Sequence, residues 1–147
     1  MIYQEKPYHY QWLVERIHYY RTWLNEKIKP GDVLQLISDY SPETIALFIA
    51  ALLNKAIVVP LTSMPEEVIN DYASITQASH QVRVNTAQLV EYYSLAHEHH
   101  VHPLYQLLME NNHSGLIILS SGSSGKSKAN FEINDNLFFP YTSLLYC

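Results

Sequence analysis

Cysteine is nearly absent from this sequence of 147 residues, and the single one is Cys147. One cysteine cannot form a disulfide framework or a cysteine-rich metal site within the chain, which favours a reducing compartment. Basic residues are also few: 9 Lys and Arg against 14 Asp and Glu give a net charge of −5 with His neutral. Because a nucleic-acid surface needs clustered Lys and Arg, we expect no nucleic-acid partner.

Long hydrophobic runs are missing as well. The longest apolar stretch, Ile45 to Leu53, is far shorter than the ~20 residues that cross a bilayer. The first residues, MIYQEKPYHYQW, lack the basic-then-apolar pattern of a signal peptide. We therefore expect a cytoplasmic protein without a membrane partner. With 48% hydrophobic and 16% charged residues, the composition is typical of one folded domain rather than of a disordered chain.

Helical and strand patterns alternate along the chain. Helices are predicted over residues 9–28, 42–55, 66–78 and around 104–108, and strands over residues 33–38, 56–61, 81–85, 116–120 and 130–134. Because strands separated by helices form βαβ crossovers, the pattern predicts an α/β fold with a mostly parallel sheet and flanking helices. The order of elements within residues 86–114 is otherwise hard to interpret, and no element is predicted from 135 to 147.

Several residues predict how these elements begin and how they are placed. Ser41 is suited to an N-cap and Pro42 to the first helical position. The helix that follows Glu43 is apolar nearly all round, so we expect it to be deeply buried. The segment Ser63-Met64-Pro65-Glu66 predicts a capping box at the next helix. Pro60 should lie at a strand end or where the sheet needs no donor.

A loop rich in serine, glycine and lysine follows the apolar run GLIILSS. Glycines let backbone N–H groups approach a ligand closely, hydroxyls add donors and lysines add positive charge. The loop also follows a strand directly, and ligands gather at the ends of strands in open α/β sheets. We therefore predict a phosphate-binding loop rather than a flexible connector. Its candidate ligand-binding residues are Ser120, Ser121, Gly122, Ser123, Ser124, Gly125, Lys126 and Lys128.

One alternative is the Walker A loop of small P-loop nucleotide-binding proteins, G-x-x-x-x-G-K-(S/T). Gly125-Lys126-Ser127 fits its end, but Ser120 stands where its first glycine belongs. A Walker A loop also opens a helix, whereas Asn130 to Asn134 alternates polar and apolar residues like a strand. A helix directly after Gly125 would favour this alternative, and a strand would oppose it.

The segment LSSGSSGKSKA resembles the phosphate loop of the AMP-forming adenylate-forming enzymes, (S/T)-S-G-(S/T)-(S/T)-G-x-P-K-G. That superfamily contains acyl-CoA synthetases, nonribosomal peptide adenylation domains and luciferases. Ser127 stands in place of the usual proline and Ala129 in place of a glycine. Upstream, Gly31-Asp32, Ser41-Pro42-Glu43 and Val59-Pro60-Leu61 match further motifs at the expected places, and Lys55-Ala56 replaces the usual Ala-Gly. The resemblance covers roughly residues 8–130.

The resemblance implies an activity and a set of ligands. Such enzymes join a carboxylic acid to ATP, form an acyl-adenylate, release pyrophosphate and usually pass the acyl group to a thiol or an amine. It implies that the loop from Ser120 to Lys128 holds the phosphates of ATP or pyrophosphate, and that Mg²⁺ accompanies ATP. The family's adenine pocket, magnesium ligand, ribose-binding aspartate and C-terminal lysine lie after the loop, and 19 residues follow Lys128 here.

We therefore expect a truncated version of the family's N-terminal α/β subdomain, with residues 1–130 forming that portion and residues 131–147 a divergent tail. A shifted reading frame near residue 130 or a truncated gene would account for the tail. Such a chain should not complete the reaction alone, and the acid and its acceptor are not encoded in it. The alternative is a non-catalytic interaction module that complements a separately encoded remainder. A sheet without its later strands would also favour a homodimer.

Two other groups of residues were weighed as sites. Four histidines, His97, His99, His100 and His102, form a cluster that could bind zinc, but three ligands converge with difficulty from one segment. We interpret it as a solvated connector. The acidic residues Glu66, Glu67 and Asp71 are explained by helix capping and the helix dipole rather than by catalysis.

Overall fold

The computed structural model describes residues 1–95, 102–121, 127–134 and 144–145, with only the backbone path from residue 120 onward. Seven strands of this described part form one sheet in the order β6-β5-β3-β4-β7-β8-β9. They are β3 (Val33–Ser38), β4 (Ile57–Leu61), β5 (His80–Val84), β6 (Val90–Ser94), β7 (Ser114–Ser121), β8 (Ser127–Asn134) and β9 (Leu144–Leu145). The four strands β5, β3, β4 and β7 run parallel, and β6, β8 and β9 join antiparallel. The predicted α/β class with a mostly parallel sheet is confirmed.

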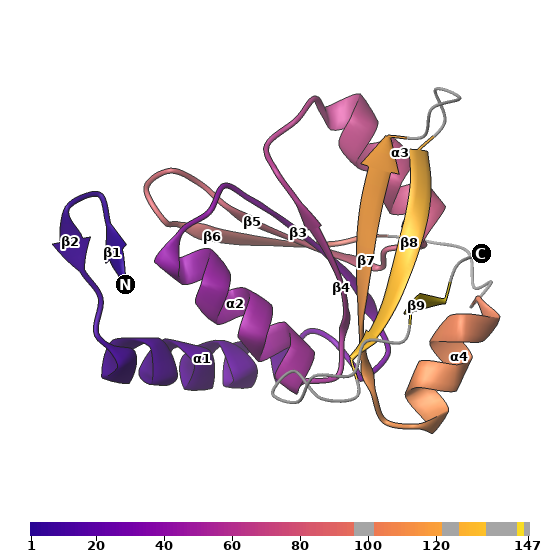
Figure 1. Ribbon diagram of the computed structural model, residues 1–147, viewed down its shortest axis with the longest axis horizontal. Coiled ribbons are helices and arrows are strands. Elements are labelled where there is room, and N and C mark those ends of the chain that lie inside the picture. Colours follow the sequence, from indigo (N-terminus) through magenta and orange to yellow (C-terminus); the bar gives the residue numbers. More distant parts are fainter. Residues whose placement is uncertain (96–101, 122–126, 135–143, 146–147) are drawn as a thin grey trace.

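Helices cover both faces of the sheet (Figure 1). They are α1 (Tyr10–Asn25), α2 (Pro42–Leu53), α3 (Glu66–Thr76) and α4 (Pro103–Glu110). Leu34 and Leu36 of β3 pack with α1 and α2, whereas Val33 and Ile37 of the same strand pack with α3 and α4. Strand residues alternate between faces, so a strand that is apolar at successive positions is buried on both sides. No helix in the described part is long and apolar enough to span a membrane.

The two predicted helix starts have different outcomes. Ser41 caps α2 as expected, because its side chain accepts a hydrogen bond from the backbone N–H of Thr44 at 3.2 Å. The capping box at Ser63 is wrong: α3 begins at Glu66 after Pro65, and no side chain caps it. The carboxylate of Glu66 is instead paired with Arg83 of β5, so it does not reach back to the chain before the helix.

Some elements were not predicted from the sequence. A small hairpin pairs β1 (Ile2–Tyr3) with β2 (Lys6–Pro7), and β6 adds an antiparallel edge beside β5. Helix α1 ends at Asn25, three residues before the predicted end at Ile28. The chain then turns through Gly31, whose φ of +87° is accessible chiefly to glycine. This turn lets the N–H of Gly31 bond the carbonyl of Lys55 at 2.8 Å.

Candidate functional site

The predicted phosphate loop joins the two strands of a long antiparallel hairpin. Strands β7 and β8 pair over eight positions, from Ser114 opposite Asn134 to Ser121 opposite Ser127, with Ser120 opposite Lys128. The backbone therefore brings Ser120, Ser121 and Lys128 of the predicted set together at one end of the hairpin. The other predicted residues, from Gly122 to Lys126, lie outside the described residues.

The secondary structure after the loop opposes the Walker A alternative. The chain continues as strand β8, which includes the predicted strand over residues 130–134, and not as a helix. A Walker A loop holds its phosphates at the N-terminus of a helix, where backbone N–H groups and the helix dipole converge. A strand at this place offers neither, so a loop between strands has to bind an anion through its own amides and side chains.

The hairpin separates from the parallel sheet near its loop. Strands β3 and β4 pair over five positions, but β4 and β7 pair only through Ile57 with Gly115 and Val58 with Leu116. Beyond that point β4 and β7 diverge toward their carboxyl ends (Figure 1). Pro60 lies in this unpaired part of β4, where its missing N–H costs no hydrogen bond to β7. The expected placement of Pro60 is therefore confirmed.

The sheet contains a topological switch point that the sequence analysis did not find. After β3 the chain crosses to α2 on one face, and after the neighbouring strand β4 it crosses to α3 on the other face. The loops at the carboxyl ends of such strands part and leave a crevice, which is where α/β proteins commonly bind ligands. Predicting it requires knowing that β3 lies between β4 and β5, and strand order is not a local pattern.

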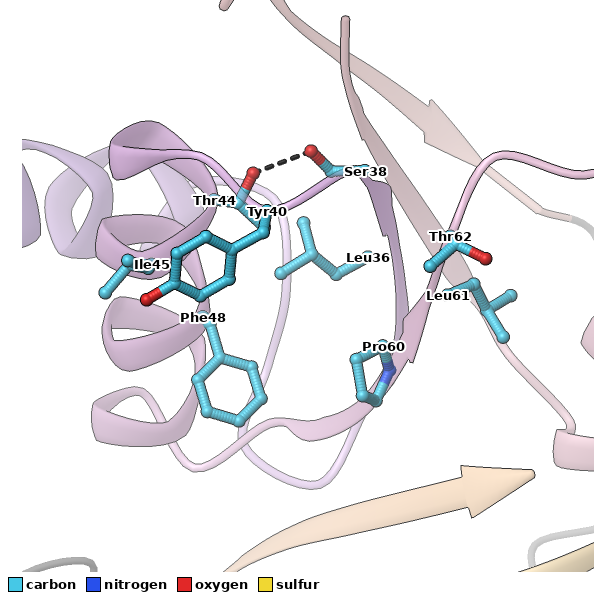
Figure 2. Close-up of a pocket in the computed structure, with 9 residues that line it drawn as sticks. All are labelled: Leu36, Ser38, Tyr40, Thr44, Ile45, Phe48, Pro60, Leu61 and Thr62. Atoms are coloured by element: carbon cyan, nitrogen blue, oxygen red, sulfur yellow. Dashed lines mark hydrogen bonds between the residues drawn. The ribbon is translucent and has the colours of Figure 1, made fainter. Parts of the chain in front are cut away.

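A pocket of about 320 Å³ opens on the α2 side of this switch point (Figure 2). Leu36 lies at its base, and Pro60 lies across from Phe48. Its lining residues are Leu36, Ser38, Tyr40, Thr44, Ile45, Phe48, Pro60, Leu61 and Thr62. None of them is charged, so the pocket is built for an apolar group. We call this cavity the α2 pocket.

A more polar cavity of about 290 Å³ lies on the α3 side of the same strand ends. Arg83, Glu66, Asp39 and Glu91 are among its lining residues. The hydrogen bonds from Arg83 hold the pKa of the Glu66 carboxyl below its ordinary value. The guanidinium of Arg83 is thereby already engaged by a carboxylate at 2.7 Å, which leaves it poorly suited to hold an anionic ligand.

Arg83 also begins a hydrogen-bonded chain that runs into the core. Its Nε donates to Gln81 at 2.8 Å, Gln81 donates to the fully buried Gln35 at 3.0 Å, and Gln35 donates to the carbonyl of Ile69 at 3.1 Å. Each buried amide thus has a partner, which buried polar groups require. The chain links β5, β3 and α3 below the polar cavity and explains two buried glutamines in the sheet.

The histidine cluster is described only at His102. Its Nδ1 accepts a hydrogen bond from the backbone N–H of Leu104 at 3.2 Å, so His102 caps α4. His97, His99 and His100 lie outside the described residues. Within the described part, no group of three or more His, Cys, Asp or Glu side chains is placed to hold a metal ion.

Glu43, which belongs to the Ser-Pro-Glu segment at the start of α2, has a larger structural role than the helix-end charge predicted for it. Its carboxylate, on a residue only 8% exposed, accepts hydrogen bonds from Tyr20 at 2.6 Å and from Arg16 at 2.9 and 3.0 Å. Burial and the bond to Glu43 raise the pKa of the Tyr20 hydroxyl strongly, so it stays a neutral donor. This cluster joins α1 to α2 at the side of the sheet that carries the α2 pocket.

A second ionisable cluster lies at the opposite, amino ends of the strands. The carboxylate of Asp32 is 3.0 Å from His80 Nε2 and accepts a hydrogen bond from the N–H of Lys29 at 2.7 Å, and His80 Nδ1 is 2.9 Å from the Tyr92 hydroxyl. Burial alone would raise the pKa of Asp32, but the bonds from His80 and Lys29 outweigh it and lower that pKa. The cluster ties the turn after α1 to β5 and β6.

Comparison with known proteins finds neither a matching family model nor a matching curated protein. Solved structures do match. The N-terminal subdomain of NpsA from Klebsiella oxytoca aligns with 90% of this chain at a TM-score of 0.65 and 22% identity, and the same subdomain in complex with 3-hydroxyanthranilyl-AMSN aligns at 0.66 and 21%. CmiS6 aligns with 87% of the chain at a TM-score of 0.61 and 13% identity.

The aligned part is a minor share of each of those proteins: this chain spans 37%, 35% and 33% of their lengths, respectively. A fused form of NpsA, described as an adenylation–PCP di-domain, aligns at a TM-score of 0.64 and 23% identity. At these identities the likeness is one of fold. The chain therefore shares the α/β fold of part of the NpsA N-terminal subdomain.

Proposed function

We propose that this chain is the N-terminal part of an AMP-forming adenylate-forming ligase, which activates a carboxylic acid with ATP. The observation that carries the proposal is the combination of this fold with this loop. The fold matches the N-terminal subdomain of NpsA over 90% of the chain, and the serine–glycine–lysine loop joins β7 to β8 within that fold.

The residues present fit a polyphosphate in their chemistry. The loop offers five serine hydroxyls, two glycines and two lysines between Ser120 and Lys128. When ATP is bound, its phosphates supply the leaving group of the adenylation reaction. The part of this chain is to bind and orient those phosphates: hydroxyls and backbone amides donate hydrogen bonds, and Lys126 and Lys128 offset the charge that develops on the departing pyrophosphate.

The remaining parts of the reaction belong to the complete enzyme in this proposal. Mg²⁺ would accompany ATP there, with ligands outside this chain. The carboxylic acid is a partner of the complete enzyme too. In support, the NpsA N-terminal subdomain has been solved in complex with 3-hydroxyanthranilyl-AMSN and with 3-hydroxybenzoyl-AMSN. We place the protein in the cytoplasm, where ATP and acyl acceptors are available.

Phosphate binding is tested on the whole chain by NMR. Pyrophosphate should shift the amide signals of Ser120, Ser121 and Lys128 at millimolar concentration, whereas sulfate at equal ionic strength should shift them less. Lys128→Ala should weaken the effect, and Lys29→Ala, which removes an exposed lysine elsewhere, should not. Absence of these shifts with both ATP and pyrophosphate would contradict the proposal.

Catalysis is tested separately by ATP–pyrophosphate exchange with a panel of carboxylic acids. The chain alone should give no exchange above background, because the adenine pocket and the catalytic lysine are expected elsewhere. Robust exchange by this polypeptide would show that the reaction is completed within 147 residues and would refute the assignment as a partial enzyme.

A second candidate is a non-catalytic module that complements a separate polypeptide, or pairs with a second copy of itself. Ile118 of β7 is 43% exposed, and its neighbour two positions earlier, Leu116, is only half-buried. Exposed apolar side chains on the central part of a sheet are typical of a surface that another chain covers. Sedimentation of the chain alone and with the remainder of an adenylation domain distinguishes the two candidates.

A further inference from the structure

The α2 pocket is unexplained by the phosphate loop, and its helix shows a mismatch between sequence and environment. From Thr44 to Leu53, α2 carries no charged residue. A helix that is apolar all round is normally buried all round. Here α1 and the sheet bury Ala46, Leu47 and Ala50, but Ile45 and Phe48 are only half-buried and line the pocket. The surplus apolar stripe faces an open cavity rather than protein.

The pocket also has the position and the size of a ligand site. It lies at the switch point between β3 and β4, where ligands commonly bind in α/β sheets. Its volume of about 320 Å³ falls within the ~300–1,000 Å³ of small-molecule pockets. A dry cavity of ~150 Å³ holds one benzene, so this one accommodates two fused rings. Tyr40, 77% exposed, and Phe48 provide aromatic rings on the helix side (Figure 2).

The polar groups at the pocket define what the ligand must offer. The Oγ of Ser38 lies 2.7 Å from the carbonyl oxygen of Asp39 and 2.6 Å from the hydroxyl of Thr44. Either Ser38 donates to Asp39 and accepts from Thr44, or it donates to Thr44. In both arrangements its one hydrogen is used and at least one lone pair remains, because a hydroxyl has one donor and two acceptor positions. Thr44 Oγ1 is already crowded, with the hydroxyl of Ser41 at 2.8 Å and the carbonyl of Asp39 at 3.1 Å. The ligand therefore contributes a donor to Ser38.

We propose that the α2 pocket binds a neutral, two-ring aromatic molecule that donates one O–H or N–H hydrogen bond to Ser38. The ligand is neutral because no charged side chain lines the pocket, and an unpaired charge is costly to bury. This site is separate from the phosphate loop, so it can be present or absent whatever the loop binds.

The test uses 2-naphthol as the probe, with naphthalene lacking the donor and 2-naphthoate carrying a charge. In titrations of the full chain followed by amide NMR, 2-naphthol should shift signals of Leu36, Thr44, Phe48 and Leu61. It should bind about 3–10-fold more tightly than naphthalene, the worth of one net hydrogen bond. The charged 2-naphthoate should bind more weakly than either.

Two matched variants locate the site. Ile45→Trp fills the pocket and should weaken 2-naphthol at least tenfold, whereas Leu53→Trp, on the exposed side of the same helix, should leave binding unchanged. Ser38→Ala should abolish the preference for 2-naphthol over naphthalene, with Ser63→Ala as its control. An unchanged Tm of the Ile45→Trp variant shows that the loss of 2-naphthol binding is local and not caused by unfolding.

Several results would overturn the proposal. The first is that the pocket amides do not shift at the solubility limit of 2-naphthol. The second is that the Ile45→Trp and Leu53→Trp variants bind 2-naphthol equally well. The third is that 2-naphthoate binds as tightly as 2-naphthol. If the same amides shift with protein concentration in the absence of ligand, a second copy of the chain occupies the pocket and the small-molecule assignment is wrong. Pyrophosphate binding is detected at the amides of residues 120–128, and 2-naphthol binding at the amides of the α2 pocket. Failure of one binding test therefore does not decide the other.

Discussion

Replacing Glu43 by alanine is expected to destabilise the chain substantially although Glu43 touches no predicted ligand. The substitution leaves the hydroxyl of Tyr20, on a residue 2% exposed, without the acceptor that lies 2.6 Å from it. Losing a buried hydrogen bond to a charged acceptor costs about 1.5–3 kcal/mol. Arg16, whose side chain is 32% exposed, can turn toward water, so its ion pair adds only about 0–1 kcal/mol.

The total loss should be about 2–3 kcal/mol in free energy of unfolding, which for a chain of this length lowers Tm by roughly 5–10 °C. Urea denaturation of wild type and variant at pH 7, with a shared m-value, measures it. Glu67→Ala serves as the control, because Glu67 is an exposed residue in the first turn of α3 and should change stability by less than about 0.5 kcal/mol.

A double-mutant cycle separates this mechanism from general damage to α2. Tyr20→Phe removes the donor, and in that background Glu43→Ala should cost at least ~1 kcal/mol less than in wild type, because the broken bond is already absent. If the two substitutions are additive, or if Glu43→Ala lies within about 0.5 kcal/mol of wild type, the hydrogen bond does not carry the predicted energy and the reasoning is refuted.

Two further predictions concern the turn after α1 and its ionisable neighbour. Because the pKa of Asp32 is lowered in the folded chain, its ionised form contributes stability above its unfolded pKa of ~3.9, and this contribution is lost as pH falls through the folded value. Between pH 5 and 2, the free energy of unfolding should therefore fall less steeply in Asp32→Asn, which removes the charged partner of His80, than in Asp71→Asn. Parallel curves for the two variants would contradict this prediction. Gly31→Ala should cost about 1–2 kcal/mol by urea denaturation, because alanine is strained at a φ of +87°. Its added Cβ would also clash with Cγ of Met109, which lies close to the backbone of α4 and cannot simply swing away. Met109→Ala should therefore restore only part of the lost stability; full rescue would show that contact rather than backbone strain is the cause.

Most of the parallel core was predictable from short-range patterns. The apolar runs of β3 and β4, the N-cap at Ser41 and the alternation in β8 each depend on residues within a few positions, and each was correctly interpreted. The edge strand β6 was missed because a strand at the rim is half exposed, and its mixture of Glu, Tyr and Ser carries no continuous apolar signal. The capping box predicted at Ser63 failed for a related reason. The local motif fits, but the carboxylate of Glu66 pairs with Arg83 on β5 instead.

For the candidate sites the division is similar. The composition of the loop from Ser120 to Lys128 indicated phosphate binding before any fold was known, and the hairpin register then placed its described ends opposite each other. The α2 pocket had no counterpart in the sequence analysis. Its base comes from Leu36 and its walls from Phe48 and Pro60, which lie on three different elements.

The sequence by itself determined the α/β class, the alternation of buried strand faces and the chemical character of the loop, because these follow from side-chain period and residue type along the chain. The tertiary structure alone decided that β3 lies between β4 and β5, that Glu66 pairs with Arg83, and that a switch point opens beside α2. Those outcomes depend on which distant segments meet, and that choice is made by the free energy of packing the whole chain rather than by any local segment.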